Sequence, residues 1–372
     1  MAGRRDGIIM RILYVDLDRE WRGGQGQALL TVRGLRALGH DAQLLSVRES
    51  PLARRAAAAG IPVHEVGKKA RRISAALLLR KMLSRQNYDV LHTNEPHALT
   101  AAWLAGAAGR ARVVASRRVA YSLSGSGLAR KRYHIAQRIA AISYFVEKSI
   151  LESGVPPEKV TVVYEGVEVP PLPTPEARRK ARQRWGVTGD EKLLGCIGYL
   201  LAEKGQEIAI RALSTLHMRI PAARLLLAGD GPCRPALEAL VQQLGLRDEV
   251  IFAGFVEDVS QVYVALDAFV FPSLAEPLGT SLLAAMAWGL PVLAVASGGV
   301  PEYVKDGDNG LLAAQSDPEL FSAGIVRLLS DESLGITLGQ NARRTIAERF
   351  SADRMVENTI HVYEGVLQEI KP

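Results

Sequence analysis

The sequence predicts an α/β protein with two doubly wound, Rossmann-like domains, and three observations lead to that fold class. Short apolar runs alternate with longer amphipathic runs along the 372 residues, a pattern typical of parallel sheets covered by helices on both faces. The length exceeds what one hydrophobic core usually supports. A proline-rich run also interrupts the alternation near the middle of the chain. We expect two such domains to face a central cleft at the carboxyl edges of their sheets, where open α/β folds bind ligands.

The first domain, residues 1–168, is predicted from apolar runs and the helical patterns between them. Helices are expected at 27–38 and 98–108, because each amphipathic run ends at a glycine, the residue that most often terminates a helix. Four prolines between Pro170 and Pro175 favour neither helix nor sheet, so residues 169–178 are predicted to form a stiff linker. The expected strands are 12–15, 42–46, 63–66, 90–92, 113–115, 138–142 and 160–163.

The alternation restarts in a second domain, residues 179–351. Its expected strands are 192–198, 224–228, 250–252, 268–271 and 291–294, and its expected helices are 206–216, 235–244 and 279–288. The tail, residues 352–372, is predicted to contain an amphipathic helix that packs back on the first domain. Its apolar face is formed by Val356, Ile360, Tyr363, Leu367 and Ile370.

Charge and cysteine content narrow the possible partners. Residues 1–165 carry 27 Lys and Arg against 13 Asp and Glu, a net charge of +14, while residues 166–372 carry a net charge of −7. This asymmetry indicates that the first half meets something anionic, although a merely solvated basic surface is the alternative. No segment approaches the ~20 continuous apolar residues of a membrane span. Cys196 and Cys233 have no neighbouring histidine cluster and suit a reducing, cytoplasmic compartment.

The residues from Ala268 to Leu312 hold the strongest functional pattern. A buried strand leads into a loop with one carboxylate, Glu276, and Gly279 then opens a helix. A second buried strand and a paired-glycine turn follow. Free amides at a helix N-terminus bind anions, and a carboxylate accepts hydrogen bonds from a diol. The stretch therefore predicts a pocket for a phosphorylated, hydroxyl-rich ligand.

The order of several motifs resembles the retaining glycosyltransferases of the GT-B fold, in particular the family-4 group. The matching pieces include DVLHTNEPH, GYLLAEKG, LLLAGDGP, VIFAGFVEDV, FPSLAEPLG and SGGVPEYVKDGDNGLL. The resemblance implies metal-independent transfer of a sugar from a nucleotide-diphosphate donor, with no other cofactor. The acceptor is expected to be a saccharide or a lipid-linked molecule in surface polysaccharide, lipopolysaccharide or glycolipid synthesis. It also implies that the second domain holds the donor and the first holds the acceptor.

The resemblance assigns the second domain most of the donor site. Lys204 and Glu276 are expected to be catalytic, because a site without metal must neutralise the leaving diphosphate with cations and amides. The structural alternatives are a surface lysine near a helix start and a helix-capping acid. The full set of expected donor-binding residues is Gly23, Gly24, Tyr199, Lys204, Val256, Glu276, Gly279, Thr280 and Ser281.

The acceptor is expected to contact residues at strand ends of the first domain. His92 and Glu95 follow one strand, and a structural role is equally open for them. Arg117 and Arg118 follow another strand, where many relatives carry a histidine near the reaction centre. A guanidinium there suits a phosphate or carboxylate of the acceptor, and Arg117 is included among the catalytic candidates.

Two further features concern membranes and metals. The basic stretch from Lys68 to Arg85 reads as a helix with Ile73 and Leu77 among arginines. Such a helix suits the surface of an anionic membrane on the inner face, although a solvated helix covering the sheet is the alternative. Nucleic acid is disfavoured because aromatic residues do not accompany the basic runs. The DLD at Asp16–Asp18 sits at a strand–loop junction, and no metal site is predicted.

The chain departs from the family pattern at three positions. Ala284 stands where a second glutamate usually binds the donor ribose, Tyr199 replaces a phosphate-binding arginine, and Glu165 replaces an asparagine. Because losing a charged hydrogen bond costs roughly 1.5–3 kcal/mol, a non-catalytic relative that acts as a binding partner stays open. A sugar-nucleotide epimerase of the same architecture is also open. A nicotinamide dehydrogenase is disfavoured because GGQGQA lacks the last glycine of its fingerprint.

Overall fold

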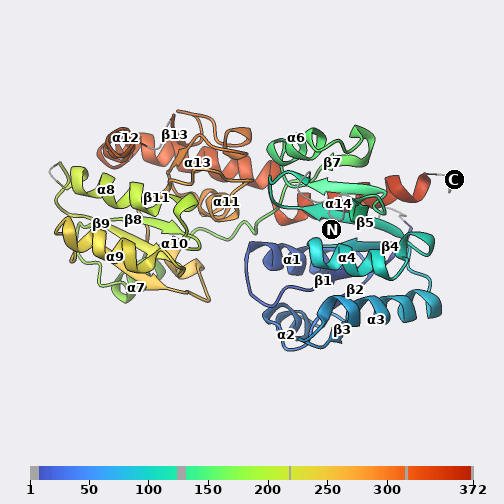
Figure 1. Ribbon diagram of the computed structural model, residues 1–372. Helices are drawn as coiled ribbons and strands as arrows, with labels where there is room; N and C mark the ends of the chain where they lie inside the picture. The colour runs from blue at the N-terminus through green and yellow to red at the C-terminus, as the bar shows by residue number, and fades with distance from the viewer. Residues whose placement is uncertain (1–7, 124–130, 218, 315–316, 370–372) are drawn as a thin grey trace. The chain divides into compact units, whose positions relative to one another are not determined.

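The computed structural model describes residues 8–123, 131–217, 219–314 and 317–369. The chain divides into two compact units (Figure 1). Residues 1–166 and 352–372 form the first unit, and residues 167–351 form the second. Each unit has its own sheet and its own hydrophobic core.

The first unit is built on a seven-stranded parallel sheet in the order β3-β2-β1-β4-β5-β6-β7. All seven expected strand positions lie in this sheet, with small shifts at their ends. The strands are β1 Arg11–Asp16, β2 Asp41–Val47, β3 Val63–Val66, β4 Val90–Thr93, β5 Arg112–Arg117, β6 Arg138–Ala141 and β7 Val160–Val162. The α-helices are α1 Gly23–Ala37, α2 Pro51–Ala58, α3 Arg71–Arg85, α4 Pro96–Leu104, α6 Tyr144–Glu152 and α14 Ala352–Gln368, and the short 3₁₀ turns are η1 Ala107–Gly109 and η3 Pro157–Lys159.

Helix α14 belongs to the first unit although it comes last in the sequence. It packs on α1 and reaches β5 and β6, where Figure 1 shows it in red beside the first sheet. The helices approach closely, because a Cβ atom at Gly34 would lie only 2.5 Å from Cγ2 of Val356. The buried side chains of Val356 and Tyr363 join the same core as Ile12. Of the expected apolar face, Ile370 lies outside the described residues.

The second unit is built on a six-stranded parallel sheet in the order β10-β9-β8-β11-β12-β13. Its strands are β8 Lys192–Ile197, β9 Ala223–Ala228, β10 Val250–Gly254, β11 Ala268–Phe271, β12 Val292–Val295 and β13 Leu311–Ala313. Its α-helices are α7 Pro175–Arg184, α8 Gln206–Leu216, α9 Arg234–Gln243, α10 Ser260–Ala265, α11 Thr280–Ala287, α12 Pro318–Ser330 and α13 Glu332–Arg349, and its 3₁₀ turns are η4 Ala202–Lys204 and η5 Val300–Glu302.

The expected linker at 169–178 is too long, because α7 already begins at Pro175. Proline suits the first helical position, where its missing N–H has no helical partner to lose. The hydroxyl of Thr174 accepts a hydrogen bond from the Ala177 amide and caps the helix. Arg178 and Arg182 then bind the carboxylate of Asp267, each at 2.8 Å. These contacts fix α7 to the second unit.

Candidate active site

The second sheet brings its candidate residues together at its topological switch point. Strand β8 continues to β9 on one side, while the neighbouring β11 continues to β12 on the other. Doubly wound folds bind ligands at the carboxyl ends of the two strands between which the winding reverses. Lys204 follows β8 at the end of η4, and Glu276 follows β11. Two of the three expected catalytic residues thus come from the two sides of the switch point.

Lys204 and Glu276 form an ion pair. The Lys204 Nζ atom donates a hydrogen bond to Oε2 of Glu276 at 2.8 Å. The Ser273 hydroxyl donates a second bond to the same oxygen at 3.0 Å. The Glu276 side chain is only 9% exposed, whereas that of Lys204 is 26% exposed. A carboxylate buried this far needs such partners, and the lysine retains an outward face.

Two glycines with positive φ allow the loops around this pair to pack. Gly205 has φ 67°, and a Cβ atom there would lie 2.1 Å from the carbonyl oxygen of Pro272. Gly298 has φ 54°, and a Cβ atom there would lie 1.9 Å from the carbonyl oxygen of Glu276. The Gly299 amide donates to that same Glu276 oxygen at 2.9 Å. The roles of Gly205 and Gly298 could not be assigned from the sequence, where the signals were a glycine directly after Lys204 and the paired-glycine turn after the second buried strand.

The N-terminus of α11 lies three residues beyond Glu276 and has the features of an anion site. Gly279, at φ 97°, occupies the N-cap, where no side chain caps the helix. The first turn contains no acidic residue. Among the described residues, the amides of Thr280 and Ser281 have no hydrogen-bond partner. These free amides and the two half-buried hydroxyl side chains suit a phosphate.

The other expected donor residues of this unit surround the same edge. Tyr199, 47% exposed, directly follows Gly198 after β8. Val256 is half-buried in the segment after β10, beside the exposed Phe255. Ala284 is half-buried on α11, one turn after Thr280, so the two share a helix face. Ala284, at the position where the family pattern has a ribose-binding glutamate, is thus partly exposed to solvent but offers no carboxylate.

In the first unit, the glycine pair opens α1 beside a buried polar network. Gly23 and Gly24 are the first residues of the helix, and the Asn94 amide donates to the Gly24 carbonyl at 3.1 Å and to Asp16 at 2.6 Å. Arg118 donates to the Asn94 carbonyl at 2.6 Å and pairs with Glu165 at 2.7 Å. The unusual glutamate at 165 is thus the counter-charge of a largely buried arginine. This pairing corrects the expectation that Arg118 is available for an acceptor.

Glu95 is a helix cap, which corrects its expected role as an acceptor contact. Its carboxylate accepts hydrogen bonds from the amides of His97 and Ala98 and so caps α4. A third bond comes from the Leu17 amide at 3.1 Å and holds the loop after β1. Burial, followed by the nearby charge of Asp16, raises the pKa of Glu95 to about 7. The residue organises the edge of the first sheet rather than presenting a free carboxylate.

His92 and Arg117 are also structural, contrary to expectation. His92 is 3% exposed, and its ring nitrogens bond to the Tyr363 hydroxyl at 2.7 Å and the Ser116 hydroxyl at 2.8 Å. Arg117 is 6% exposed, and its guanidinium donates to the carbonyl of Tyr121 and the hydroxyl of Tyr133. Both ring nitrogens of His92 are occupied, and the Nε atom of Arg117, which has no partner among the described residues, is buried. Neither side chain therefore offers an exposed polar group to a ligand, so we assign neither to acceptor binding or catalysis.

The buried His92 should make the first unit sensitive to acid. Burial, and then the charge of Arg118, lowers the pKa of His92 to about 3. The stabilising neutral form is fully present above the unfolded pKa of about 6.5, and its contribution is lost as the pH falls toward 3. We expect the unfolding free energy to lose up to about 1.4 kcal/mol per pH unit in this window. The stability difference between wild type and His92→Gln, measured by urea unfolding, should shrink as the pH falls from 6.5 to 4, and a constant difference would contradict this assignment.

The described residues contain neither a metal-ligating cluster nor a membrane-spanning helix. No group of three or more His, Cys, Asp or Glu side chains gathers there in a way that suits a metal ion. Asp16 instead accepts hydrogen bonds from Gln25 at 3.0 Å and from the Asp18 amide at 2.9 Å. Within the same residues, no helix combines the length and apolar character that a membrane span requires.

Comparison with known proteins defines the class. The Anabaena protein HepE, solved with UDP and glucose, superposes with a TM-score of 0.84 at 23% identity, over 95% of this chain and 99% of that one. This likeness establishes the GT-B fold. The family model described as glycosyl transferases group 1 matches residues 177–345, and that of glycosyltransferase family 4 matches residues 21–169. The chain therefore belongs to the family-4 type of GT-B glycosyltransferases.

Two relatives show how far the likeness extends in sequence. An uncharacterised glycosyltransferase of Methanocaldococcus jannaschii is 35% identical over 60% of this chain and 60% of its own length. A lipopolysaccharide core biosynthesis glycosyltransferase of Rhizobium meliloti is 32% identical over 47% of this chain and 51% of its own length. The chain thus matches between half and two thirds of the length of these two relatives.

Proposed function

We propose that this glycosyltransferase moves a sugar from a nucleotide-diphosphate donor to an acceptor hydroxyl, with retention of anomeric configuration and without a metal ion. The observation that carries the proposal is the Lys204–Glu276 pair beside the uncapped N-terminus of α11. One edge of one sheet thus offers an ammonium and free amides for a diphosphate, and a carboxylate for sugar hydroxyls. The Anabaena neighbour, solved with UDP and glucose, supports the donor class.

The main requirement of the reaction is stabilisation of the leaving diphosphate. As the bond between the anomeric carbon and the diphosphate oxygen breaks, negative charge grows on that oxygen. Lys204 keeps two N–H donors beyond the one that it gives to Glu276, and the amides of Thr280 and Ser281 lie at a positive helix end. These groups stabilise the charge as it develops.

Retention follows when the acceptor attacks from the face that the diphosphate leaves. The acceptor oxygen forms the new bond to the anomeric carbon, and its proton passes to the departing phosphate oxygen. No side-chain base is then required, in agreement with the structural roles of His92 and Arg117. Glu276, held by Lys204 and Ser273, orients the sugar through its free lone pairs.

A site of this kind suits a cytoplasmic enzyme of surface glycan or glycolipid synthesis. Both cysteines are free, and Cys196 is buried, as expected in a reducing compartment. The Rhizobium relative named for lipopolysaccharide core biosynthesis supports the pathway class. The departures at Ala284 and Tyr199 leave a non-catalytic binding protein as the second candidate.

A donor screen tests the proposal. We expect one nucleotide-diphosphate sugar among UDP-, GDP- and ADP-linked donors to raise the melting temperature, since a ligand that binds only the folded state stabilises it. Slow release of the free nucleoside diphosphate with added chelator should accompany binding. Sugar binding without any turnover would favour the non-catalytic candidate, and interconversion of two donors without an acceptor would favour an epimerase. For a donor with an α-linked sugar, NMR of the product should show an α linkage, and a β linkage would refute retention.

A further inference from the structure

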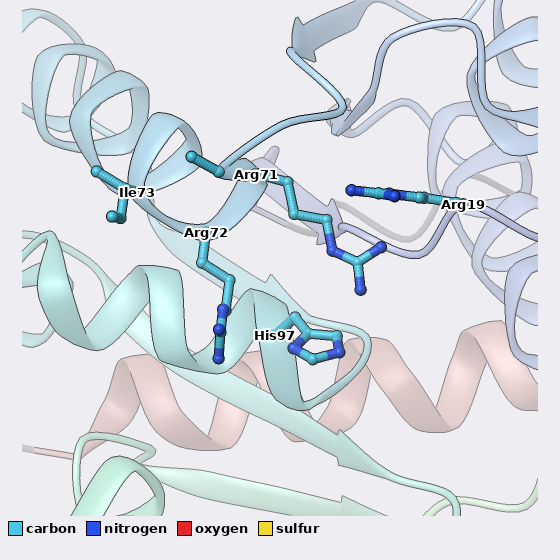
Figure 2. Close-up of a pocket in the computed structure, with 6 residues that line it drawn as sticks. Arg19, Arg71, Arg72, Ile73 and His97 are labelled. Carbon is cyan, nitrogen blue, oxygen red and sulfur yellow. The ribbon is translucent and has the colours of Figure 1, made fainter.

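A basic pocket lies at the carboxyl edge of the first sheet, outside the candidate donor site. It has a volume of about 370 Å³ and is lined by Arg19, Ala70, Arg71, Arg72, Ile73 and His97. Figure 2 shows the guanidinium groups of Arg19, Arg71 and Arg72 and the imidazole of His97 directed toward a common space. The volume is within the range of small-molecule pockets and exceeds the need of a single small anion.

The strand order explains why these residues meet. Arg19 follows β1, Arg71 and Arg72 follow β3, and His97 follows β4. All three strands run parallel in one sheet, so their carboxyl ends share one edge. The sheet reverses its winding between β1 and β4, and the pocket has a residue after each of them. It is therefore at the topological switch point of the first sheet, as the Lys204–Glu276 pair is in the second.

The pocket carries an excess of positive charge. Among the described residues, the guanidinium groups of Arg71 and Arg72 have no hydrogen-bond or ion-pair partner, and the guanidinium of Arg19 donates only to the backbone carbonyl of Lys68. The N-terminus of α3 opens into the same place, with Ala70 at its cap, no capping side chain and no acid in its first turn. Guanidinium groups and helix amides together favour an oxyanion with several acceptor oxygens.

The pKa of His97 reflects the same excess of positive charge. Burial, followed by the charges of Arg71 and Arg72, lowers the pKa of its imidazole, while the half-buried Asp18 on the loop after β1 acts in the opposite direction. Arg132, whose guanidinium donates to the Thr100 hydroxyl on α4, adds a further positive charge. An anion bound among these groups would offset the cations and favour the protonated imidazole.

We infer that this pocket binds a phosphoryl group carried by the acceptor. The inference rests on the proposed function and adds the chemical class of the acceptor: a phosphate ester, whether a soluble sugar or polyol phosphate or the phosphate of a lipid. The exposed Ile73 at the rim and Leu77 one turn further on α3, 59% and 67% exposed, offer an apolar surface to the rest of a lipid molecule.

Paired variants on one helix test the site. Arg71→Ala/Arg72→Ala removes two charges from the pocket, and Arg80→Ala/Lys81→Ala removes two charges from the exposed face of the same helix outside it. Inorganic phosphate binding, measured by calorimetry without donor, should weaken at least about tenfold in the first variant and stay unchanged in the second. Equal affinities in the two variants would overturn the inference.

A conservative variant and a pH series sharpen the result. Arg71→Lys/Arg72→Lys keeps the charge but loses the paired donors of the guanidinium, so its affinity should fall between wild type and the alanine variant. Sulfate, whose charge is constant from pH 5 to 8, should bind more tightly as the pH falls, because His97 gains a proton on binding. In His97→Gln the sulfate affinity should not depend on pH, and an unchanged pH dependence would remove His97 from the site.

One soluble and two membrane probes distinguish the source of the phosphate. Glycerol 1-phosphate is compared with vesicles of phosphatidylcholine alone and with phosphatidic acid added. Vesicle sedimentation that needs phosphatidic acid and is lost only in Arg71→Ala/Arg72→Ala assigns the phosphate to a lipid. Glycerol phosphate binding lost only in that variant, without sedimentation, assigns it to a soluble acceptor. If vesicle sedimentation is lost equally in Arg71→Ala/Arg72→Ala and Arg80→Ala/Lys81→Ala, and both variants bind inorganic phosphate with equal affinity, the pocket is not the phosphate site.

Failure of this inference is distinguishable from failure of the proposed function. Phosphate binding is measured without a nucleotide sugar, and donor hydrolysis is measured without an acceptor. A protein that binds phosphate through Arg71 and Arg72 but never consumes donor would refute the transferase proposal alone. A protein that hydrolyses donor but binds phosphate equally in both double variants would refute the pocket alone.

Discussion

Replacing Lys204 with methionine is expected to reduce donor turnover by about 100- to 1,000-fold, the range measured when one donor to a developing oxyanion is removed. Methionine keeps the length of the side chain and removes the ammonium. Donor affinity should fall less than turnover, because the amides of α11 still hold the ground-state diphosphate. The measurement is the rate of nucleoside diphosphate release at saturating donor.

A loss of folding must be separated from this loss of catalysis. Lys204→Met leaves Glu276 with only the Ser273 hydroxyl as a side-chain partner among the described residues. Because the Glu276 side chain is only 9% exposed, leaving it without this partner is expected to cost roughly 1–3 kcal/mol of stability. Adding Glu276→Gln removes the unpaired charge, so the double variant should regain stability and stay inactive. Lys192→Met, at the exposed start of β8 and the opposite end of the sheet, should behave as wild type. A Lys204→Met enzyme with full turnover would refute the proposed role.

The strands of the two sheets and the Lys204–Glu276 site could be predicted from the sequence because both depend on local patterns. Each buried parallel strand is a short apolar run, and helices between such runs force them to align their carboxyl ends. Lys204 and Glu276 each lie in the segment that connects a buried strand to the next α-helix. Once β8 and β11 are neighbours, the two residues have to lie at one place, and they meet at 2.8 Å.

The first-unit residues were misassigned because their partners are remote in the chain. His92 lies on a strand like any cleft-facing histidine, but Tyr363, which occupies its Nδ1 atom, comes 271 residues later on α14. Arg118 is similarly held by Glu165. The basic pocket combines residues after β1, β3 and β4, and only the order of strands in the sheet brings them together. Strand alternation indicates which residues share a face, but it does not indicate what covers that face.

Substituting Gly298 with alanine is expected to reduce turnover by roughly 100-fold, although it removes no group that contacts substrate. At φ 54° an alanine is strained, and its Cβ atom would lie 1.9 Å from the carbonyl oxygen of Glu276. That carbonyl must move, together with its 2.9 Å hydrogen bond from the Gly299 amide. A displacement of about 1 Å in a positioned group is enough for a loss of this size.

Gly307→Ala is the matched control for backbone strain. Gly307 also has positive φ, 74°, but no atom lies within 4 Å of the Cβ that alanine would add. Both variants should lose about 1 kcal/mol of stability from the left-handed conformation. Only Gly298→Ala should lose turnover and the thermal stabilisation by donor, because only there does the new methyl group displace the residue that orients the sugar. If the two variants lose activity equally, the position of Glu276 does not depend on the contact with residue 298. The proposed role of Glu276 in orienting the sugar is then refuted.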